Sequence, residues 1–336
     1  MSRTAWLVVN EFLQLNKFNE IHEWLRIAAD KLSIKLILKT NAELLIDLRS
    51  KDLHKKAGDS SFSLEIGKEL DRVEAQKVNV VHGKGDTGDP DFVLFWDKDT
   101  RLARHLEQLG YPVFNSSDAI AVCDDKSLTH LALMNEDIPM PRTIIAPKTF
   151  DNIGYTNANF LKEVTDRLGF PLVVKECFGS FGQQVYLVKE SEELRTLVAN
   201  IGTKPMLYQE FVSYSAGRDV RLQVVGGKVI ASMYRYSENG DFRANLSIGG
   251  KMLPYEPSAE QCEMAVRCCE ILGLDYAGVD LLFGKNGETL VCEVNSNAHF
   301  KNIYDCTGVN AADAILVHII NKLEAYIQDK RYASLE

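Results

Sequence analysis

Three oxygen-bearing side chains in the last sixth of the chain could form a metal site if they share one face of a hairpin. Residues 278–295 alternate apolar and polar positions on either side of a glycine-containing turn, which predicts two antiparallel strands. Because successive side chains of a strand point to opposite faces, Asp280, Glu293 and Asn295 are expected on one face. Two carboxylates and an amide oxygen suit Mg²⁺ that carries phosphate groups, and they suit zinc poorly.

The opposite face of this predicted hairpin is expected to be apolar. A register shift of two residues keeps the grouping, whereas a shift of one residue would bury the three polar groups. The alternative is a solvated polar face without a metal, because Asp and Glu are common on exposed strands. The same alternation assigns six side chains to the apolar face, namely Val279, Leu281, Phe283, Leu290, Cys292 and Val294.

A lysine followed by a loop of small residues forms a second candidate site. Lys175 interrupts an apolar strand predicted at residues 171–176, and the loop after it contains Gly179, Ser180 and Gly182. Small residues let backbone amides approach phosphate oxygens, and the lysine supplies positive charge. This is not a Walker loop, because no GK[ST] sequence opens a helix, and the alternative is an ordinary hairpin turn.

Two further segments could contact a phosphate-bearing ligand. Lys126 follows Asp124 and Asp125 at a predicted helix start, although a lone lysine in that place is more often a solvated surface charge. Residues 208–212 are predicted as a strand whose apolar wall and adjacent amide edges could hold an adenine ring.

Composition limits the classes of protein to consider. The 336 residues carry 38 Lys plus Arg against 47 Asp plus Glu, a formal net charge of −9, which argues against sequence-independent binding of nucleic acid. No apolar run approaches the roughly 20 residues of a membrane span. The seven cysteines are irregularly spaced, which indicates reduced thiols and a cytoplasmic protein. The length predicts about two domains.

The first third of the chain alternates short apolar runs with helical patterns. Strands are expected near residues 5–9, 35–39 and 92–96, with a helix at 18–32 between the first two, which predicts a parallel sheet. The sequence GKGDTG at residues 83–88 matches the dinucleotide pattern GxGxxG, but it leads into a strand and opens no helix, so an ordinary loop is the preferred interpretation.

In their order along the chain, these pieces resemble the ATP-grasp superfamily, and more narrowly the RimK-like carboxylate-amine ligases. The similar region runs from about residue 115 to residue 320 and covers roughly two thirds of the chain. Each motif is weak alone, and the order makes the resemblance specific. Besides the Lys126 segment, the motifs are VVKECFGSFGQQVYLV, YQEFV, GRDVRLQVVGGKVIASMYRYSENGDFRANLSIGG and AGVDLLFGKNGETLVCEVNSNAHFKN.

The resemblance implies an α/β and α+β architecture with three parts. An N-terminal α/β (pre-ATP-grasp) domain would span residues 1–117, a central lobe 118–206 and a C-terminal lobe with the magnesium site 207–330, with ATP clamped between the two lobes. Lys126 and Lys175 would contact the phosphates.

Further residue roles follow from the same resemblance. The loop with Gly179, Ser180 and Gly182 would close over the phosphates, while Asp280, Glu293 and Asn295 would bind Mg²⁺, with Mn²⁺ as an alternative. The remaining matches assign Glu210, Phe211 and Val212 to the adenine edge, Asp219 to the ribose, and Arg235, Arg243 and Asn245 to the transferring phosphate and the acyl intermediate.

The implied activity is the joining of a carboxylate to an amine through an acyl phosphate, with an amino acid or peptide as substrate and glutamate as one candidate. The partners are small molecules or peptides rather than nucleic acid or membranes, and self-association is left open. A phosphotransferase of the same fold and a nucleotide-binding regulatory protein without turnover are the alternatives. Relatives that join glutamate read NLxRGG or NxxRGG, whereas this chain has Ile248 in place of the arginine. This difference predicts an uncharged substrate group at that position, unless Arg235 or Arg243 supplies the charge.

Overall fold

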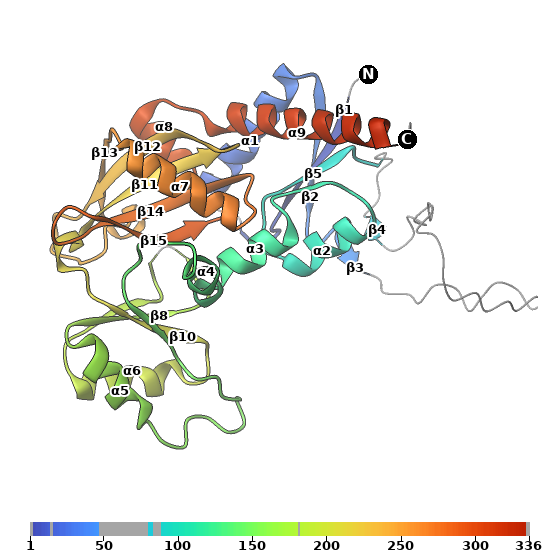
Figure 1. The fold of residues 1–336 in the computed structure, drawn as a ribbon. Coiled ribbons are helices and arrows are strands. Elements are labelled where there is room, and N and C mark those ends of the chain that lie inside the picture. Colours follow the sequence, from blue (N-terminus) through green and yellow to red (C-terminus); the bar gives the residue numbers. More distant parts are fainter. Residues whose placement is uncertain (1–2, 14–15, 47–79, 83–88, 181, 334–336) are drawn as a thin grey trace, which may run out of the picture.

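The structure is a computed structural model that describes residues 3–13, 16–46, 80–82, 89–180 and 182–333. The described residues form three sheets of four or five strands and one two-stranded sheet (Figure 1). The glycine pattern at residues 83–88 lies outside the described residues. No single described helix is long and apolar enough to cross a membrane, although the bent pair Lys301–Thr307 and Ala311–Ala325 has the length and composition when taken together.

The first sheet is parallel, as the alternation of apolar runs and helical patterns predicts. Its strand order is β2-β1-β5-β6, and every pairing is parallel. β1 and β5 are almost wholly buried because helices cover the sheet, which explains their continuous apolar sequences. The elements are β1 (Arg3–Val9), α1 (Asn16–Lys31), β2 (Ile34–Thr40), β5 (Phe92–Phe95), α2 (Thr100–Gln108) and β6 (Val113–Phe114), with β3 (Leu44–Ile46) and β4 (Val80–His82) paired separately.

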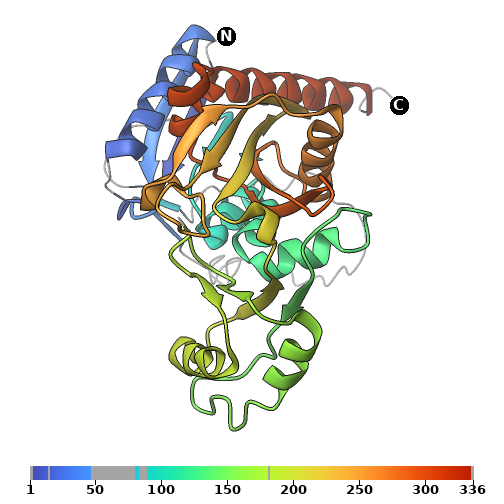
Figure 2. The same ribbon diagram turned by 90° about the vertical axis from the view of Figure 1, so that its left-hand side faces the viewer.

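The second sheet is antiparallel and forms a lobe that projects from the rest of the chain (Figures 1 and 2). Helices α5 and α6 pack on one face against Leu172, Val174 and Tyr208. Alternation then sends Val173 and Lys175 to the other face. The elements are β7 (Thr143–Ile145), α5 (Phe160–Leu168), β8 (Leu172–Glu176), β9 (Val185–Val188), α6 (Ser191–Ile201) and β10 (Met206–Glu210), in the strand order β7-β10-β8-β9.

The third sheet has the strand order β13-β12-β11-β14-β15 and is also antiparallel. Helix α7 packs on its apolar face, against a core that includes Leu222, Val279 and Leu281. The helix begins with a capping box between Ser258 and Gln261. The elements are η1 (Ser213–Ser215), β11 (Arg218–Val225), β12 (Lys228–Tyr236), η2 (Leu246–Ile248), β13 (Lys251–Pro254), α7 (Ala259–Ile271), β14 (Tyr276–Phe283) and β15 (Thr289–Asn295).

Four further helices join these layers. α9 packs beside α1, and Figure 2 shows the two helices next to each other at one end of the molecule. Residues of α1, β1 and α9 share one core with Tyr276 and Phe300, so the first and third sheets are held together by apolar packing. These helices are α3 (Ser117–Asp124), α4 (Lys126–Leu133), α8 (Lys301–Thr307) and α9 (Ala311–Ala333).

A single buried asparagine also links the first and third sheets. Asn115 is fully buried, and its amide nitrogen donates to the main-chain oxygens of Tyr276 and Ser296, both at 2.9 Å. Its amide oxygen accepts from the Asp275 N–H at 2.7 Å. The same oxygen also accepts from the Tyr276 N–H at 3.3 Å. An apolar residue at position 115 would lose all four hydrogen bonds. The parallel sheet is therefore fixed relative to the strand that carries Asp280.

Candidate functional site

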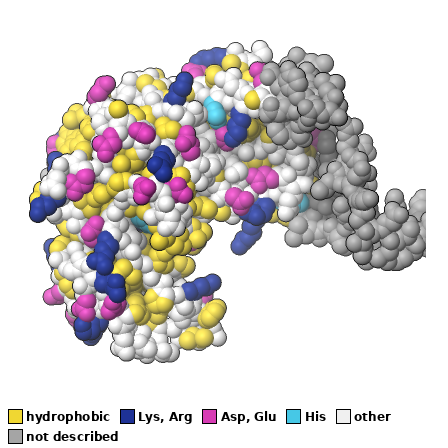
Figure 3. Space-filling model, viewed as in Figure 1, with side chains coloured by type: hydrophobic (Ala, Val, Ile, Leu, Met, Phe, Trp, Pro, Cys, Tyr) yellow, Lys and Arg dark blue, Asp and Glu magenta, His cyan; other side chains and the backbone are white. Residues whose placement is uncertain are grey.

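One cavity of about 550 Å³ lies where the three sheets meet. Its walls come from the carboxyl edge of the parallel sheet, the free face of the second sheet and the polar face of the third sheet. On the outer face drawn in Figure 3, Lys and Arg side chains are interspersed with Asp and Glu. The cavity is lined by all fifteen residues that the sequence nominates: Lys126, Lys175, Gly179, Ser180, Gly182, Glu210, Phe211, Val212, Asp219, Arg235, Arg243, Asn245, Asp280, Glu293 and Asn295.

The predicted hairpin is confirmed as β14 and β15. Asp280 lies opposite Glu293, and Gly278 lies opposite Asn295. The three polar side chains therefore share the face that lines the cavity, as the period-two alternation predicts. The metal role that the sequence assigns to them remains a prediction.

The predicted apolar face of this hairpin is wrong at Leu290 and Cys292. The pairing shifts after Asp280, so that Leu281 lies opposite Val291 and Cys292 has no opposite residue. This β-bulge places one extra residue, Cys292, in β15. The side chains of β15 before the bulge therefore point to the opposite face from the one that the alternation of Glu293–Asn295 would give them. Val291, which is 1% exposed, takes the core position, whereas Cys292 lines the cavity with its sulfur 3.7 Å from Lys175 Nζ.

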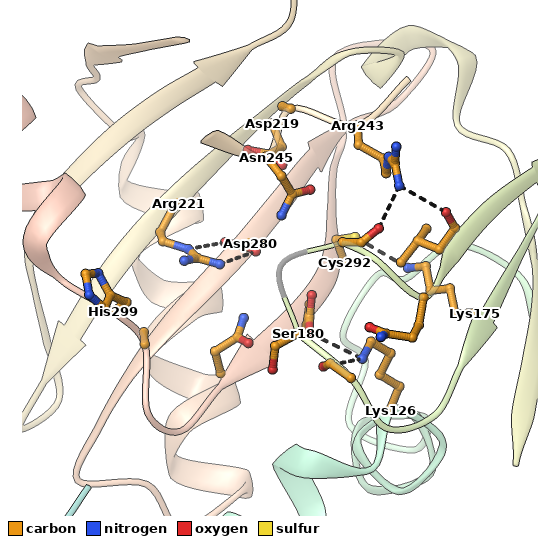
Figure 4. A pocket seen from close by; sticks show the side chains of 18 of the residues that line it. Lys126, Lys175, Ser180, Asp219, Arg221, Arg243, Asn245, Asp280, Cys292 and His299 are labelled. Atoms are coloured by element: carbon orange, nitrogen blue, oxygen red, sulfur yellow. Dashed lines mark hydrogen bonds and ion pairs between the residues drawn. The ribbon is translucent and has the colours of Figure 1, made fainter. Parts of the chain in front are cut away.

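The carboxylate of Asp280 is bound by two arginines, Arg221 of β11, which Figure 4 shows beside it, and Arg235 of β12. Arg221 donates through Nε and Nη2 to its two oxygens, at 2.7 and 2.6 Å, and Arg235 Nη2 lies 3.0 Å from Oδ2. Arg235 also donates to both oxygens of Asp219, at 2.6 and 2.8 Å. The four charged groups form a buried network, here called the Asp–Arg cluster, with no net charge.

Burial and ion pairing shift the pKa values of the two aspartates in opposite directions. Burial disfavours the ionised form of Asp280, but the charges of Arg221 and Arg235 outweigh this cost and keep its pKa below the ordinary value. Burial raises the pKa of Asp219, and the neighbouring negative charge of Asp280 adds to the rise, which its partner Arg235 offsets only in part. Asp280 is therefore the more firmly ionised carboxylate.

Sequence reasoning missed Arg221. The residue lies two positions after Asp219 on β11, so both side chains point to the cavity, while Val220 and Leu222 enter the core. The signal was available, because polar and apolar residues alternate through this strand. Gly278 provides space beside it, since an added Cβ there would lie 2.6 Å from Ala298 Cβ and 3.6 Å from the Arg221 side chain.

The residues on β14 and β15 fit a Mg²⁺ ion by donor chemistry. Asp280 and Glu293 supply carboxylate oxygens, and the buried Asn295 Nδ2 has no hydrogen-bond partner in the described part of the chain. Turning this amide would present its oxygen there. Among the described residues no three His, Cys, Asp or Glu side chains gather as a metal cage, as expected where phosphate and water supply the other ligands.

Lys126 and Lys175, the lysines predicted to contact phosphate, line the same cavity as the metal patch formed by Asp280, Glu293 and Asn295. Lys126 begins α4, as predicted, and Asp125 caps that helix by accepting from the Ser127 and Leu128 N–H groups. Lys126 Nζ lies 3.3 Å from the Gly179 carbonyl oxygen and 3.7 Å from Glu293 Oε1. Lys175 is 7% exposed, on the cavity face of β8.

The loop after β8 is held close to the third sheet. Gly182 has a φ of +73°, and an added Cβ would lie 2.9 Å from Asn245 Oδ1. Its carbonyl accepts a hydrogen bond of 2.7 Å from Arg243 Nη1 (Figure 4). Arg243 is in turn paired with Asp241 at 2.8 Å. Glycine at position 182 is therefore required both by the backbone conformation and by the close approach of Asn245.

The candidate adenine end of the cavity lies where β10 ends. The Glu210 side chain accepts from the Arg142 N–H at 2.8 Å, so its carboxylate already has a partner within the lobe. Val173 and Leu282 supply apolar walls on two sides, and Phe211 packs edge-on against Phe242 with ring centroids 6.3 Å apart. An apolar slot beside a strand end suits a flat ring that is read by backbone groups.

Comparison with known proteins agrees with this geometry. The model of the RimK-like ATP-grasp domain matches residues 123–319. Beta-citrylglutamate synthase B of Danio rerio is 34% identical over 70% of this chain and 56% of its own length. A probable alpha-L-glutamate ligase of Xanthomonas axonopodis pv. citri is 37% identical over 66% of this chain and 72% of its own.

The similarity to solved structures extends beyond the matched domain. D-alanine–D-alanine ligase of Bacillus anthracis superposes with a TM-score of 0.65 at 18% identity, covering 98% of this chain and 100% of that one. At this identity the comparison establishes the fold alone, which is the ATP-grasp fold. With a family model that matches more than half of its residues and a cavity between the sheets of that fold, the chain belongs to the RimK-like ATP-grasp family.

Proposed function

We propose that this chain joins a carboxylate to an amine as an amide, with cleavage of ATP to ADP and phosphate. The observation that carries the proposal is the 3.7 Å approach of Lys126 Nζ to Glu293 Oε1. It brings a cation from α4 against a carboxylate of the third sheet, beside the loop with Gly179. A phosphate chain bound beside this pair would meet the positive charge of Lys126 and, next to it, the predicted magnesium ligands.

The nucleotide would lie between the second and third sheets. Lys126 and Lys175 would neutralise its phosphate oxygens, and the loop of Gly179, Ser180 and Gly182 would cover them. The backbone of residues 210–212 would hold the adenine. Asp219 would bind the ribose, as the resemblance implies, and it would also support Arg235, because both its oxygens accept from that arginine.

Asp280, Glu293 and Asn295 would hold Mg²⁺, or Mn²⁺ in its place. When bound, the metal would neutralise negative charge on the phosphate oxygens during transfer. Asp280 shares its carboxylate with Arg221 and Arg235, which fixes its orientation toward the cavity. Each carboxylate oxygen can accept more than one partner, so the arginines leave room for a metal bond.

The reaction sequence follows from the chemistry of carboxylates. An amine cannot displace oxide from a carboxylate at neutral pH, so the carboxylate first receives the γ-phosphoryl group and becomes an acyl phosphate. Attack by the amine then expels phosphate. Arg235, Arg243 and Asn245 line the part of the cavity where negative charge would develop, and they would stabilise it. The surrounding walls would keep water from the acyl phosphate.

An amino acid or peptide is the proposed amine substrate, and glutamate is the first one to test. The two relatives described above carry glutamate in their names. The chain spans only 56% of the length of the Danio rerio protein, so glutamate as a substrate of this chain is a proposal.

We also propose a cytoplasmic location, because all seven cysteines are free thiols. For the domains we propose boundaries after residues 117 and 206. The second boundary falls at the start of β10, whose residues 206–210 belong to the second sheet.

The decisive experiment is an ADP-release assay with ATP, Mg²⁺ and pairs of carboxylates and amines, each partner omitted in turn. Sustained ADP release that needs both partners, with an amide detected by mass spectrometry, is the expected result. A stable phosphorylated product without amine would instead identify a phosphotransferase. Nucleotide binding without ADP release for any pair would identify a regulatory protein.

A further inference from the structure

The end of the cavity formed by the parallel sheet contains a buried carboxylate that the mechanism above does not use. Asp97 follows β5 at the carboxyl edge of the sheet, is 5% exposed and lines the cavity. Ligands of parallel sheets bind at this edge, because the loops after the strands gather there. Asp97 therefore needs an explanation beyond its contribution to the core.

No cation that the structure describes forms an ion pair with Asp97. Asn10 Nδ2 donates to its two oxygens at 3.2 and 3.3 Å, and the Lys98 N–H donates at 2.7 Å, but these donors are uncharged. The ammonium of Lys98 lies instead on Asp124, at 2.6 Å. Burial raises the pKa of Asp97, as expected for a carboxylate without a charged partner.

A hydrogen-bond acceptor without a described donor, Asn297 Oδ1, lies on the residue next to Asp97. Asn297 donates through Nδ2 to the main-chain oxygen of Asp97 at 2.7 Å, whereas its buried Oδ1 has no partner among the described residues. Both residues line the cavity. A carboxylate without a charged partner and an amide oxygen without a donor are complementary to a ligand with several N–H groups and a positive charge.

The position agrees with a substrate that reacts near the metal patch. Asn297 follows Asn295 by two residues, so their Cα atoms are separated by at most about 7 Å. Asn115, which bonds to the Ser296 carbonyl between them, keeps this segment against the parallel sheet. A group held by Asp97 and Asn297 would thus lie within the reach of one amino acid from the predicted metal ligands.

We propose that Asp97 and Asn297 bind the ammonium group of an amino-acid substrate, and that this group gives one proton to the Asp97 carboxylate, so that the neutral amine attacks the acyl carbon as phosphate leaves. This inference rests on the proposed function and adds the amine subsite to it. Asp97 supplies the charge, Asn297 Oδ1 accepts a hydrogen bond, and Asn10 holds the carboxylate in place. The N-terminal sheet would then select the amine, while the two other sheets hold the nucleotide.

The test uses hydroxylamine as a competing nucleophile. This small uncharged amine intercepts an acyl phosphate as a hydroxamate without needing an ammonium subsite. Wild type is first assayed with hydroxylamine and with each of the common amino acids. Failure of both to cause ADP release with any carboxylate contradicts the proposed function itself. Hydroxamate formation with no reaction of any amino acid contradicts only the ammonium subsite.

With an active amino acid, the ratio of amide to hydroxamate is then measured in mixtures of the two nucleophiles. The ratio cancels any change in the formation of the acyl phosphate. We expect Asp97→Asn to shift it at least tenfold toward hydroxamate, and Asp118→Asn, an exposed aspartate of α3 paired with Arg104, to leave it unchanged. An unchanged ratio in Asp97→Asn overturns the proposal.

A measurement on wild type covers the case in which Asp97→Asn fails to fold. Two analogues of the active amino acid are compared as inhibitors of amide formation. The α-hydroxy acid of the same shape lacks the ammonium group, whereas the N-methyl amino acid keeps its positive charge. The α-hydroxy acid should inhibit at least tenfold more weakly. Equal inhibition by the two analogues would also overturn the proposal.

Discussion

Lys126 Nζ lies 3.7 Å from Glu293 Oε1, although the two residues are far apart in the sequence. Lys126 begins α4, which contacts β15, and its N–H donates to the Cys177 carbonyl oxygen after β8 at 3.1 Å, while Glu293 lies on β15. Both side chains line the cavity, with 12% and 32% of their surfaces exposed. The lysine and the carboxylate thus lie next to each other at the edge of the space proposed for the phosphate chain.

Glu293→Gln should abolish turnover while the fold persists. The substitution keeps the side-chain volume but removes one negative charge from the predicted metal patch, which weakens Mg²⁺ binding and misplaces the γ-phosphate. We expect kcat to fall at least about 100-fold at saturating Mg²⁺, with a melting temperature near that of wild type.

The matched control for this variant is Glu260→Gln, on the exposed first turn of α7. It should retain wild-type kcat. If Glu293→Gln also keeps wild-type kcat at saturating Mg²⁺, Glu293 is not a metal ligand.

Arg221→Lys should lower the free energy of unfolding by about 1–2 kcal/mol, because lysine cannot donate two parallel hydrogen bonds to a buried carboxylate. Urea denaturation measures this difference. The Arg104→Lys variant is the control, since Arg104 pairs with Asp118 on the surface and should change stability by less than about 0.5 kcal/mol. Equal losses in the two variants would show that the Asp–Arg cluster is no more sensitive than a surface pair.

The alternation of side chains was sufficient to place Asp280, Glu293 and Asn295 on one face, because only the period of a strand is needed for that. The bulge at Cys292 was not predictable in the same way, since it depends on pairing with β14 and leaves no mark in the local pattern. Arg221 was predictable from alternation with Asp219. The role of Asp97 in the cavity was not predictable, because nothing in the sequence near β5 indicates that the end of this strand contacts the loop after β15.

Stability should fall on acidification partly through His130. Burial, and secondarily the charge of Lys175, lower the pKa of His130 to about 4, whereas the unfolded chain has the ordinary value of 6.5. Below pH 6.5 the unfolded state binds a proton that the folded state does not, so stability is lost between about pH 6.5 and pH 4, by at most about 1.4 kcal/mol per pH unit.

Urea denaturation of wild type and His130→Gln across this interval isolates the contribution of His130. The wild type should lose more stability than the variant as the pH falls. Parallel curves for the two proteins would mean that His130 becomes protonated without a cost in the folded state.

Ile248→Arg should change substrate preference. Ile248 is half-buried in the short helix η2, and an arginine there would offer a bidentate partner to a substrate carboxylate. We expect wild type to prefer substrates with an uncharged group at this position, and the variant to gain about tenfold in kcat/KM for acidic ones. Assays over acidic and neutral substrates measure both values.

The contrary result for Ile248 is also specific. A wild-type enzyme that strongly prefers glutamate and is unaffected by the substitution would show that Arg235 or Arg243 already supplies the charge. The Ile248→Leu variant, which keeps the apolar character, controls for loss of packing.

The central claim is that a carboxylate is activated as an acyl phosphate, and transfer of an oxygen isotope tests it most directly. With a carboxylate substrate labelled in both oxygens with ¹⁸O, the account predicts that each turnover moves one labelled oxygen into inorganic phosphate and leaves the other in the amide. Mass spectrometry of the phosphate measures this. Amide formation with unlabelled phosphate would contradict the account, because the carboxylate oxygen would then have left by another route.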